Sequence, residues 1–339
     1  MRSKTAMLSL SHAAVDLACA ALVFGRLLTG EVWLNVVLYN AFAFLMQLPM
    51  GVIADRLNRN MLFAAAGCAL VALAYPLAGV PPLAAVIAGI GNGAFHVGGG
   101  IEVLNGSGGK AGALGVFVSP GAIGLYIGTF FAEKLWETPW LVPAAMVLIG
   151  LLLALVSFKK SRFVSENAEF EPELERDGAL PLASLFLVVV LRAFMGTTDA
   201  FSAKSALSAL PAFAAGLIPV LCLALGKAAG GFVSDAIGIK RTSAVSLGLC
   251  AVLLLLPGPA FTLAALFLFN MTMPITLFAS ARLLKGAKGT AFGLLTAALF
   301  LGSVPAFLGI RLSLPAWLSA ALAGWSLALL LLGLKKERG

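Results

Sequence analysis

The chain has 339 residues, of which 60% are hydrophobic and 11% are charged, and its mean hydropathy is +1.01. Soluble domains carry roughly 45–50% apolar and about 25% charged residues, so the composition excludes an ordinary soluble enzyme, and a chain this apolar does not stay disordered. The formal net charge of +8 would suit a nucleic-acid partner, but the positions of the charges give it another origin. The composition therefore predicts a protein that lies in a lipid bilayer.

Runs of about 20 mostly apolar residues, bounded by charges or turn signals, are typical of membrane-spanning helices. Twelve such runs occur, and short segments rich in Gly and Pro separate several of them, as at 79–82 and 257–259. The sequence predicts an all-α membrane protein with twelve transmembrane helices in two pseudo-symmetric six-helix bundles. The expected spans are 6–28, 32–53, 61–79, 82–101, 111–132, 139–158, 181–203, 207–234, 241–257, 259–280, 288–310 and 313–334.

Residues 159–180 form the one long polar segment. Basic residues at 159, 160 and 162 are followed by six acidic residues between 166 and 177. Such a stretch stays hydrated, so we expect it to act as a tether and interpret its acidic run as a solvated surface. It divides the chain into an N-terminal bundle, 1–158, a cytoplasmic linker, 159–180, and a C-terminal bundle, 181–339.

Lysine and arginine are distributed unevenly between the two ends of the expected helices. With the N-terminus inside, 17 of the 23 basic residues fall at inner ends, four at outer ends and two within spans. This bias predicts a multi-pass protein of the cell (inner) membrane with both termini in the cytoplasm. It also explains the net charge without nucleic acid. The expected partners are lipid, a small-molecule substrate and protons, and a monomer is expected.

Motifs for other activities are missing from the sequence. There is no GxxxxGK[ST], GxSxG or HExxH pattern, so no enzyme and no cofactor are expected. The four cysteines lie in apolar runs without ligand spacing, and we interpret them as small buried hydrophobic residues. The first apolar run lacks a small-residue cleavage site, so no cleavable signal peptide is expected.

A short motif occurs twice, 180 residues apart. Gly51 and Asp55 follow the second expected helix, and Gly231 and Asp235 follow the eighth, each pair with basic residues close behind. A repeat of six helices related by an axis along the membrane normal is one of the known transporter layouts.

Both copies resemble the cytoplasmic loop motif of the major facilitator superfamily. In that family the glycine lets two helices approach, and the aspartate meets basic groups and a helix end in a gate on the inner face. Asn58 stands where glycine is usual in the first copy, and Ala236 replaces an arginine in the second. The resemblance implies gating roles for Gly51, Asp55, Arg56, Arg59, Gly231, Asp235 and Arg241.

Three further segments, 11–16, 91–96 and 115–124, are similar to the fosmidomycin-resistance family of proton-coupled efflux proteins. The last also resembles the glycine–proline motif of drug/proton antiporters, with Ser119 in place of a glycine. Residues 97–100 depart from these relatives, which usually have a proline and an acid there. We expect Gly115, Pro120, Gly121 and Gly124 to form a helix-packing motif, whose glycines serve either close packing or a rocking motion, and Pro120 to kink its helix.

Ionisable residues inside the expected spans are few and costly, which makes them the candidate site. His12 and Asp16 share one helix face at i, i+4, and His96 lies at a comparable depth in the fourth expected helix. We expect Asp16, with His12 and His96, to bind and pass protons. The alternative is that the histidines only bond to the backbone of a neighbouring helix.

Arg192 follows His12 by 180 residues, so the repeat places it at the matching height in the other bundle. It could bind an anionic or polar ligand, or it could pair with Asp199. Tyr39 and Thr276 are candidates for further polar contacts with the substrate. Lys227 is predicted to extend to the inner surface.

These features favour a proton-coupled secondary transporter, a small-molecule or drug efflux antiporter that works by alternating access. Two alternatives remain. Asp16, His12 and His96 could instead be ligands for a transported divalent transition metal, with no resident metal site expected. The same fold could also serve a non-transporting membrane sensor, because fold alone does not fix activity.

Overall fold

The computed structural model describes residues 2–30, 32–158, 173–203 and 206–334. The first six expected spans correspond to α1 (Arg2–Leu22) with the π-helical turn η1 (Val23–Leu27), α2 (Val32–Asn40) with η2 (Ala41–Leu45) and α3 (Gln47–Leu57), α4 (Asn60–Ala74), α5 (Pro81–Gly106), α6 (Gly112–Val118) with α7 (Pro120–Phe130), and α9 (Leu141–Phe158), with the short α8 (Ala132–Leu135) before α9. The last six correspond to α10 (Ala179–Thr197), α11 (Ala212–Ile237), α12 (Ile239–Leu253), α13 (Pro259–Asn270) with α14 (Thr272–Leu283), α15 (Lys288–Phe307) and α16 (Ala316–Gly333).

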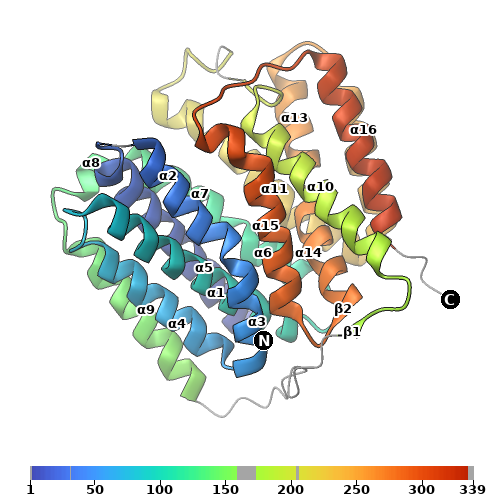
Figure 1. Ribbon diagram of the computed structural model, residues 1–339. Coiled ribbons are helices and arrows are strands. Elements are labelled where there is room, and N and C mark those ends of the chain that lie inside the picture. Colours follow the sequence, from blue (N-terminus) through green and yellow to red (C-terminus); the bar gives the residue numbers. More distant parts are fainter. Residues whose placement is uncertain (1, 31, 159–172, 204–205, 335–339) are drawn as a thin grey trace.

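The described chain is an all-α membrane protein, as the composition predicts. Ten helical stretches are long and apolar enough to cross a bilayer, and α4 and α12 are shorter, with 15 residues each. The arrangement is consistent with twelve crossings. The helices of residues 2–158 gather on one side of the molecule and those of residues 179–333 on the other (Figure 1).

Several helix bounds differ from the expected ones. The seventh span ends at Thr197 rather than 203, and the eighth runs over 212–237 rather than 207–234. Besides the break at Met46 between η2 and α3, two spans are interrupted, between Val118 and Pro120 and at Met271. Proline explains both interruptions, because Pro120 and Pro274 lack the N–H that would bond to the carbonyl four residues earlier.

The end of the predicted linker is ordered against the C-terminal helices. β1 (Glu173–Leu174) pairs antiparallel with β2 (Leu284–Lys285), in the loop between α14 and α15, and the Glu175 N–H donates to the carbonyl of Leu283 at 3.0 Å. Residues 159–172 of the linker lie outside the described residues. The bounds of the linker and of the two bundles remain predictions.

Glycines let helix backbones touch. On α7, Gly124 and Gly128 lie against the backbone of Ala13 and Leu17 on α1, where any Cβ would overlap the carbonyl oxygens. On α11, Gly226 lies in the same way against Phe267 of α13, and Gly230 lies against Met271, the residue between α13 and α14. Small residues permit this approach, which is a source of dispersion energy between helices in lipid.

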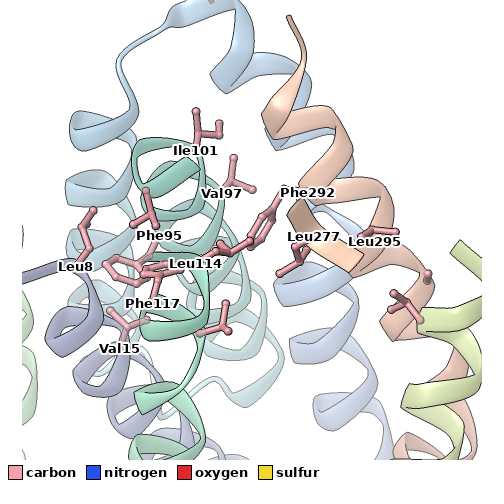
Figure 2. Close-up of a cluster of buried hydrophobic side chains, with 14 of the residues drawn as sticks. Leu8, Val15, Phe95, Val97, Ile101, Leu114, Phe117, Leu277, Phe292 and Leu295 are labelled. Carbon is pink, nitrogen blue, oxygen red and sulfur yellow. The ribbon is translucent and has the colours of Figure 1, made fainter. Parts of the chain in front are cut away.

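Apolar side chains fill the contact between the two sets of helices. Phe292 of α15 reaches Gly100 of α5, where an added Cβ would lie 2.6 Å from its ring. Figure 2 shows Phe292 between Val97 on one side and Leu277 and Leu295 on the other. We call the end of the bundle that holds residues 54–60, 105–112, 235–241 and 284–290 the motif end, and the opposite end the far end.

Candidate functional site

His12 and Asp16 of α1 meet His96 of α5 inside the N-terminal set of helices. The Nε2 atoms of the two histidines are 2.8 Å apart. Asp16 Oδ2 lies 3.2 Å from His12 Nε2, and Asp16 Oδ1 lies 3.6 Å from His96 Nε2. The structure therefore brings together the three residues that the sequence singled out, and we call them the His–Asp cluster.

The remaining ring nitrogen of each histidine faces a backbone carbonyl. His12 Nδ1 lies 2.7 Å from the oxygen of Phe117, and His96 Nδ1 lies 2.8 Å from the oxygen of Asn92. A carbonyl only accepts, so both Nδ1 atoms must donate, and in the neutral ring each Nε2 then carries a lone pair. His12 thus bonds to the backbone of a neighbouring helix, as the alternative reading expects, whereas His96 bonds to its own helix. Both histidines also present Nε2 to Asp16.

Helix packing fixes the cluster in place. The His12 ring lies against Phe117, at 4.9 Å between centroids, and near Phe95, at 6.2 Å. The side-chain amide of Asn92 donates to Asp16 Oδ1 at 3.1 Å. His12 is 5% exposed, whereas the side chain of Asp16 is 19% exposed. The carboxylate is therefore reachable by a small molecule such as water.

Gly121 forms one wall of the cluster. A Cβ at this position would collide with His12 Nε2 and Asp16 Oδ2. Of the expected helix-packing motif, Gly121 and Gly124 thus lie against α1. Gly115 faces α11 instead, where its Cβ would lie 2.8 Å from the carbonyl oxygen of Lys227.

The interruption between α6 and α7 presents two successive carbonyls to side chains. Phe117 O accepts from His12, and Val118 O accepts from the Lys227 ammonium of α11 at 3.4 Å. The prediction that Lys227 extends to the inner surface is therefore wrong, because its helix face packs on α6.

Arg192 of α10 contacts hydroxyl groups of α14. Its guanidinium donates to Thr276 Oγ1 at 2.8 Å and reaches Thr272 Oγ1 at 3.4 Å. Arg192 and Thr276, which the sequence analysis proposes as substrate contacts, thus lie together. The backbone of Tyr39, on α2, lies against Gly89 of α5, and its side chain is partly buried against the core.

Asp199 is misplaced by the sequence-based prediction. Because α10 ends at Thr197, Asp199 lies in the exposed loop at the far end. It accepts hydrogen bonds from the Ser313 hydroxyl and from the Leu314 N–H, the latter at 2.9 Å. These bonds lower the pKa of Asp199 below its usual value. Asp199 neither pairs with Arg192 nor lies beside the other expected substrate contacts.

At the motif end, each repeated aspartate binds the start of a helix in the other half of the chain. Asp55 accepts from the N–H groups of Gly289 and Thr290, both at 2.8 Å, and from the Thr290 hydroxyl at 2.9 Å. Asp235 accepts from the N–H groups of Ala111 and Gly112, at 2.8 and 2.9 Å. Carboxylates suit the positive end of a helix dipole and its unpaired N–H groups.

The glycine of each motif lies where the two halves touch. A Cβ on Gly51 would collide with the carbonyl of Gly289, and one on Gly231 would lie 2.8 Å from the carbonyl oxygen of Ala111. Arg56, Arg59 and Arg241 are exposed at this end, and Arg59 lines a pocket there with Lys4 and Glu102, which form an ion pair at 3.0 Å. We call the contacts of Asp55 and Asp235 the two clamps.

Two features escaped the sequence-based analysis. One is the direction of the Lys227 side chain. Lys227 precedes Gly231 by four residues, so both lie on the same face of the helix. If Gly231 faces a partner helix, Lys227 faces that helix too. Nothing in the sequence identified the start of α15 as the partner of Asp55, because that contact spans 234 residues of chain.

No family model and no curated protein matches the sequence. Solved structures match it over nearly its whole length. One is the major facilitator superfamily transporter FucP in the outward conformation, with 13% identity, 97% of each chain covered and a TM-score of 0.64. A variant of the E. coli fucose:proton symporter FucP is 13% identical, with 98% of each chain covered and a TM-score of 0.66.

A bacterial homologue of the iron transporter ferroportin, in an outward-facing state with soaked iron, is 16% identical, with 97% of each chain covered and a TM-score of 0.59. At these identities the likeness shows the fold alone. The chain therefore has the fold of major facilitator superfamily transporters and is built as a multi-pass membrane protein. The solved structures named here are described as transporters.

Proposed function

We propose that this protein is a proton-coupled secondary transporter that works by alternating access, with the His–Asp cluster as its proton-binding group. One observation supports this most strongly. Two Nε2 atoms at 2.8 Å and a carboxylate converge, while both Nδ1–H groups are already donated to carbonyls. Two facing lone pairs repel, and a single proton between them converts the contact into an N–H···N hydrogen bond beside a negative charge.

Electrostatics favours such a proton. Asp16 is the one acidic residue of α1, and a charge at the bilayer centre costs about 2.5–3.5 kcal/mol on insertion scales. One proton on the cluster makes its total charge zero. Histidine is suited to gain and release a proton near neutral pH. A group of this kind can therefore bind a proton on one side of a membrane and release it on the other.

The two clamps support alternating access. Both are contacts between the halves of the chain, both are at the motif end, and they involve equivalent positions of the repeat. The motif end is then the closed end in this state. Opening it requires only that the carboxylates exchange their N–H partners for water. We place the motif end at the cytoplasm, following the excess of lysine and arginine.

The finer assignment rests on the sequence alone. The likeness of segments 11–16, 91–96 and 115–124 to fosmidomycin-resistance proteins favours efflux of a small molecule or drug in exchange for protons, across the inner membrane. The cluster itself serves symport equally well, because a proton-binding group has no direction of its own. A monomer suffices, since the site and both clamps lie within one chain.

Transport measurements in liposomes test this proposal. Purified protein is reconstituted with a pH-sensitive dye inside, and drugs, organic anions and organic cations are added in turn. At least one compound is expected to change the internal pH, and Asp16→Asn should reduce that change at least tenfold. Asp199→Asn, at the far end, is the matched control and should keep it. Transport of a compound without any proton movement, or full coupling in Asp16→Asn, would refute the assignment.

A second test needs no substrate, because the chain has only two histidines. Protein labelled with ¹⁵N-histidine, with any affinity tag removed, should show both Nδ1 atoms protonated and one proton shared by the two Nε2 atoms. Asp16→Asn should remove that shared proton at neutral pH. Two independent neutral rings in the native protein would contradict the proposal.

Export of a divalent transition metal is the second candidate. The three residues of the cluster offer ligand atoms that all lie within 4.8 Å of one another, and imidazole with carboxylate suits such metals. Typical metal–nitrogen distances of about 2.0–2.1 Å put two tetrahedral histidine ligands about 3.3 Å apart, farther than the 2.8 Å found here. The contact therefore favours the proton. Stabilisation by Zn²⁺, Co²⁺ or Fe²⁺ that disappears in His96→Ala would favour the metal instead.

A further inference from the structure

Arg192 and Lys227 are two cations in the interior of the bundle that have no anionic partner in the described part of the chain. Among the residues that the structure describes, neither lies within 4.0 Å of a carboxylate oxygen. The hydrogen bonds of Arg192 go to Thr272 and Thr276, and that of Lys227 goes to a carbonyl. A guanidinium has five N–H donors, so most of its capacity remains unused here.

The cations lie close to the His–Asp cluster and to each other along the chain of contacts. The Lys227 ammonium reaches the Val118 carbonyl, next to the Phe117 carbonyl that accepts from His12. On α11, Gly226 and Gly230 flank Lys227 and lie against Phe267 and Met271, and the residue after Met271 is Thr272, which Arg192 reaches. Two positive charges and one carboxylate leave one excess positive charge, and a proton on the cluster raises the excess to two. Charge of this kind inside a membrane protein is expensive and marks a functional site. An anion between Arg192 and Lys227 would compensate it.

The geometry also selects the kind of anion. Arg192 is held on α10 by the two hydroxyls of α14, which fixes the plane of its guanidinium, while Lys227 comes from α11. A guanidinium binds two oxygens of one oxyanion side by side, and an ammonium adds a point charge. Lys227 thus supplies a second cation, which the sequence-based analysis did not place in the site.

We propose that Arg192 and Lys227 together bind the oxyanion group, a carboxylate or phosphate, of an organic anion that this protein transports. This inference rests on the proposed transport function and names the chemical class of its substrate. Because a proton on the cluster raises the excess positive charge that the anion compensates, the binding of the proton and that of the anion are coupled through Asp16 and Lys227. Thr272 and Thr276 are positioning residues that orient Arg192.

The test measures binding rather than transport. Purified full-length protein in detergent is titrated with benzoate, phthalate and phenyl phosphate, and with the neutral benzamide and the cationic benzylamine, at constant ionic strength. Thermal stabilisation and calorimetry report affinity. The anions are expected to stabilise the protein and the neutral and cationic analogues are not. If no anion stabilises it, or benzamide acts as strongly as benzoate, the inference is overturned.

Variants locate the site. Arg192→Gln and Lys227→Gln should each weaken anion binding at least tenfold, and Lys227→Arg should keep it within a few-fold. Lys110→Gln, an exposed lysine at the motif end, is the matched control and should have no effect. Unchanged affinity in Lys227→Gln would overturn the inference. If Arg192→Gln does not fold, the comparison of Lys227→Gln with Lys227→Arg and the series of analogues still test the inference.

Two further arms separate related outcomes. Protein in nanodiscs of phosphatidylcholine should bind the soluble anions as in detergent, and competition by phosphatidylglycerol would show that a lipid headgroup is the occupant, which overturns a transported anion. Asp16→Asn that keeps anion binding but loses proton movement supports both assignments. Proton-coupled transport of only neutral or cationic compounds would refute the anion site alone, and anion binding without proton coupling would refute the proposed function alone.

Discussion

Replacing Asp55 by alanine removes three hydrogen bonds that join the two halves of the chain at the motif end. The carboxylate accepts from Gly289 N–H, Thr290 N–H and the Thr290 hydroxyl. The first turn of α15 then loses its cap, and its N–H groups stay unpaired as long as this end remains closed. We expect the closed state of the motif end to lose stability relative to the open state.

The size of the effect follows from the bonds. A hydrogen bond to a charged group contributes about 1.5–3 kcal/mol, and loss of a helix cap costs about 0.5–2 kcal/mol. The three bonds share one carboxylate and are not additive, so about 2–4 kcal/mol is expected, which is about 30- to 1,000-fold in the equilibrium. A 99:1 preference for the closed state would fall to between about 3:1 and 1:9.

Distances between spin labels measure this equilibrium. In a chain whose four native cysteines are replaced, labels at Leu57 and Lys285 report the separation of the halves, because both positions are exposed at the motif end. Asp55→Ala should shift the population to longer distances. Asp235→Ala, which removes two bonds, should shift it less. Asp199→Ala, at the far end, should leave it unchanged.

A distance distribution that is identical in the native protein and in Asp55→Ala would refute this reasoning. The clamp would then add nothing to the closed state, and the packing at Gly51 and Gly231 would hold the halves together without it. A loss of folded protein in Asp55→Ala would be recognised by a lower thermal stability. In that case Asp55→Asn, which keeps one acceptor oxygen, should give a smaller shift in the same direction.

Two more predictions concern single positions. Gly121→Ala should displace His12 and Asp16 and reduce proton coupling at least tenfold in the liposome assay. Gly79→Ala is the control, because nothing lies within 4 Å of an added Cβ there, and it should keep the coupling. Equal coupling in both variants would contradict the packing at Gly121. Asp199 has a pKa below its unfolded value of 3.8, because of its bonds from Ser313 and Leu314, so its stabilising effect is present above that pH and is lost as the pH falls through the lowered value. Asp199→Asn should therefore lower the free energy of unfolding at pH 6 by less than about 1 kcal/mol at this exposed site, which appears as a slightly lower melting temperature. The difference should shrink towards pH 3, and a difference that grows on acidification would show the opposite sign.

The class of fold and most of the candidate site residues can be predicted from the amino-acid sequence. Its apolar runs and their breakers predict the helices, and the repeat at Gly51 and Gly231 predicts two related halves. The cost of buried charge identifies His12, Asp16 and His96. All of these inferences depend on spacing along one helix or on composition, which a sequence states directly.

Which groups meet depends on the packing of the helices against one another. The approach of the two imidazoles, the binding of Asp55 to the start of α15 and the direction of Lys227 depend on how each helix is rotated and tilted against its neighbours. The place of Asp199 depends on where α10 ends, since two residues more of helix would have carried it into the span. Periodicity fixes the face of a residue on its own helix, but packing between helices sets what that face touches, because those contacts join residues far apart in the chain.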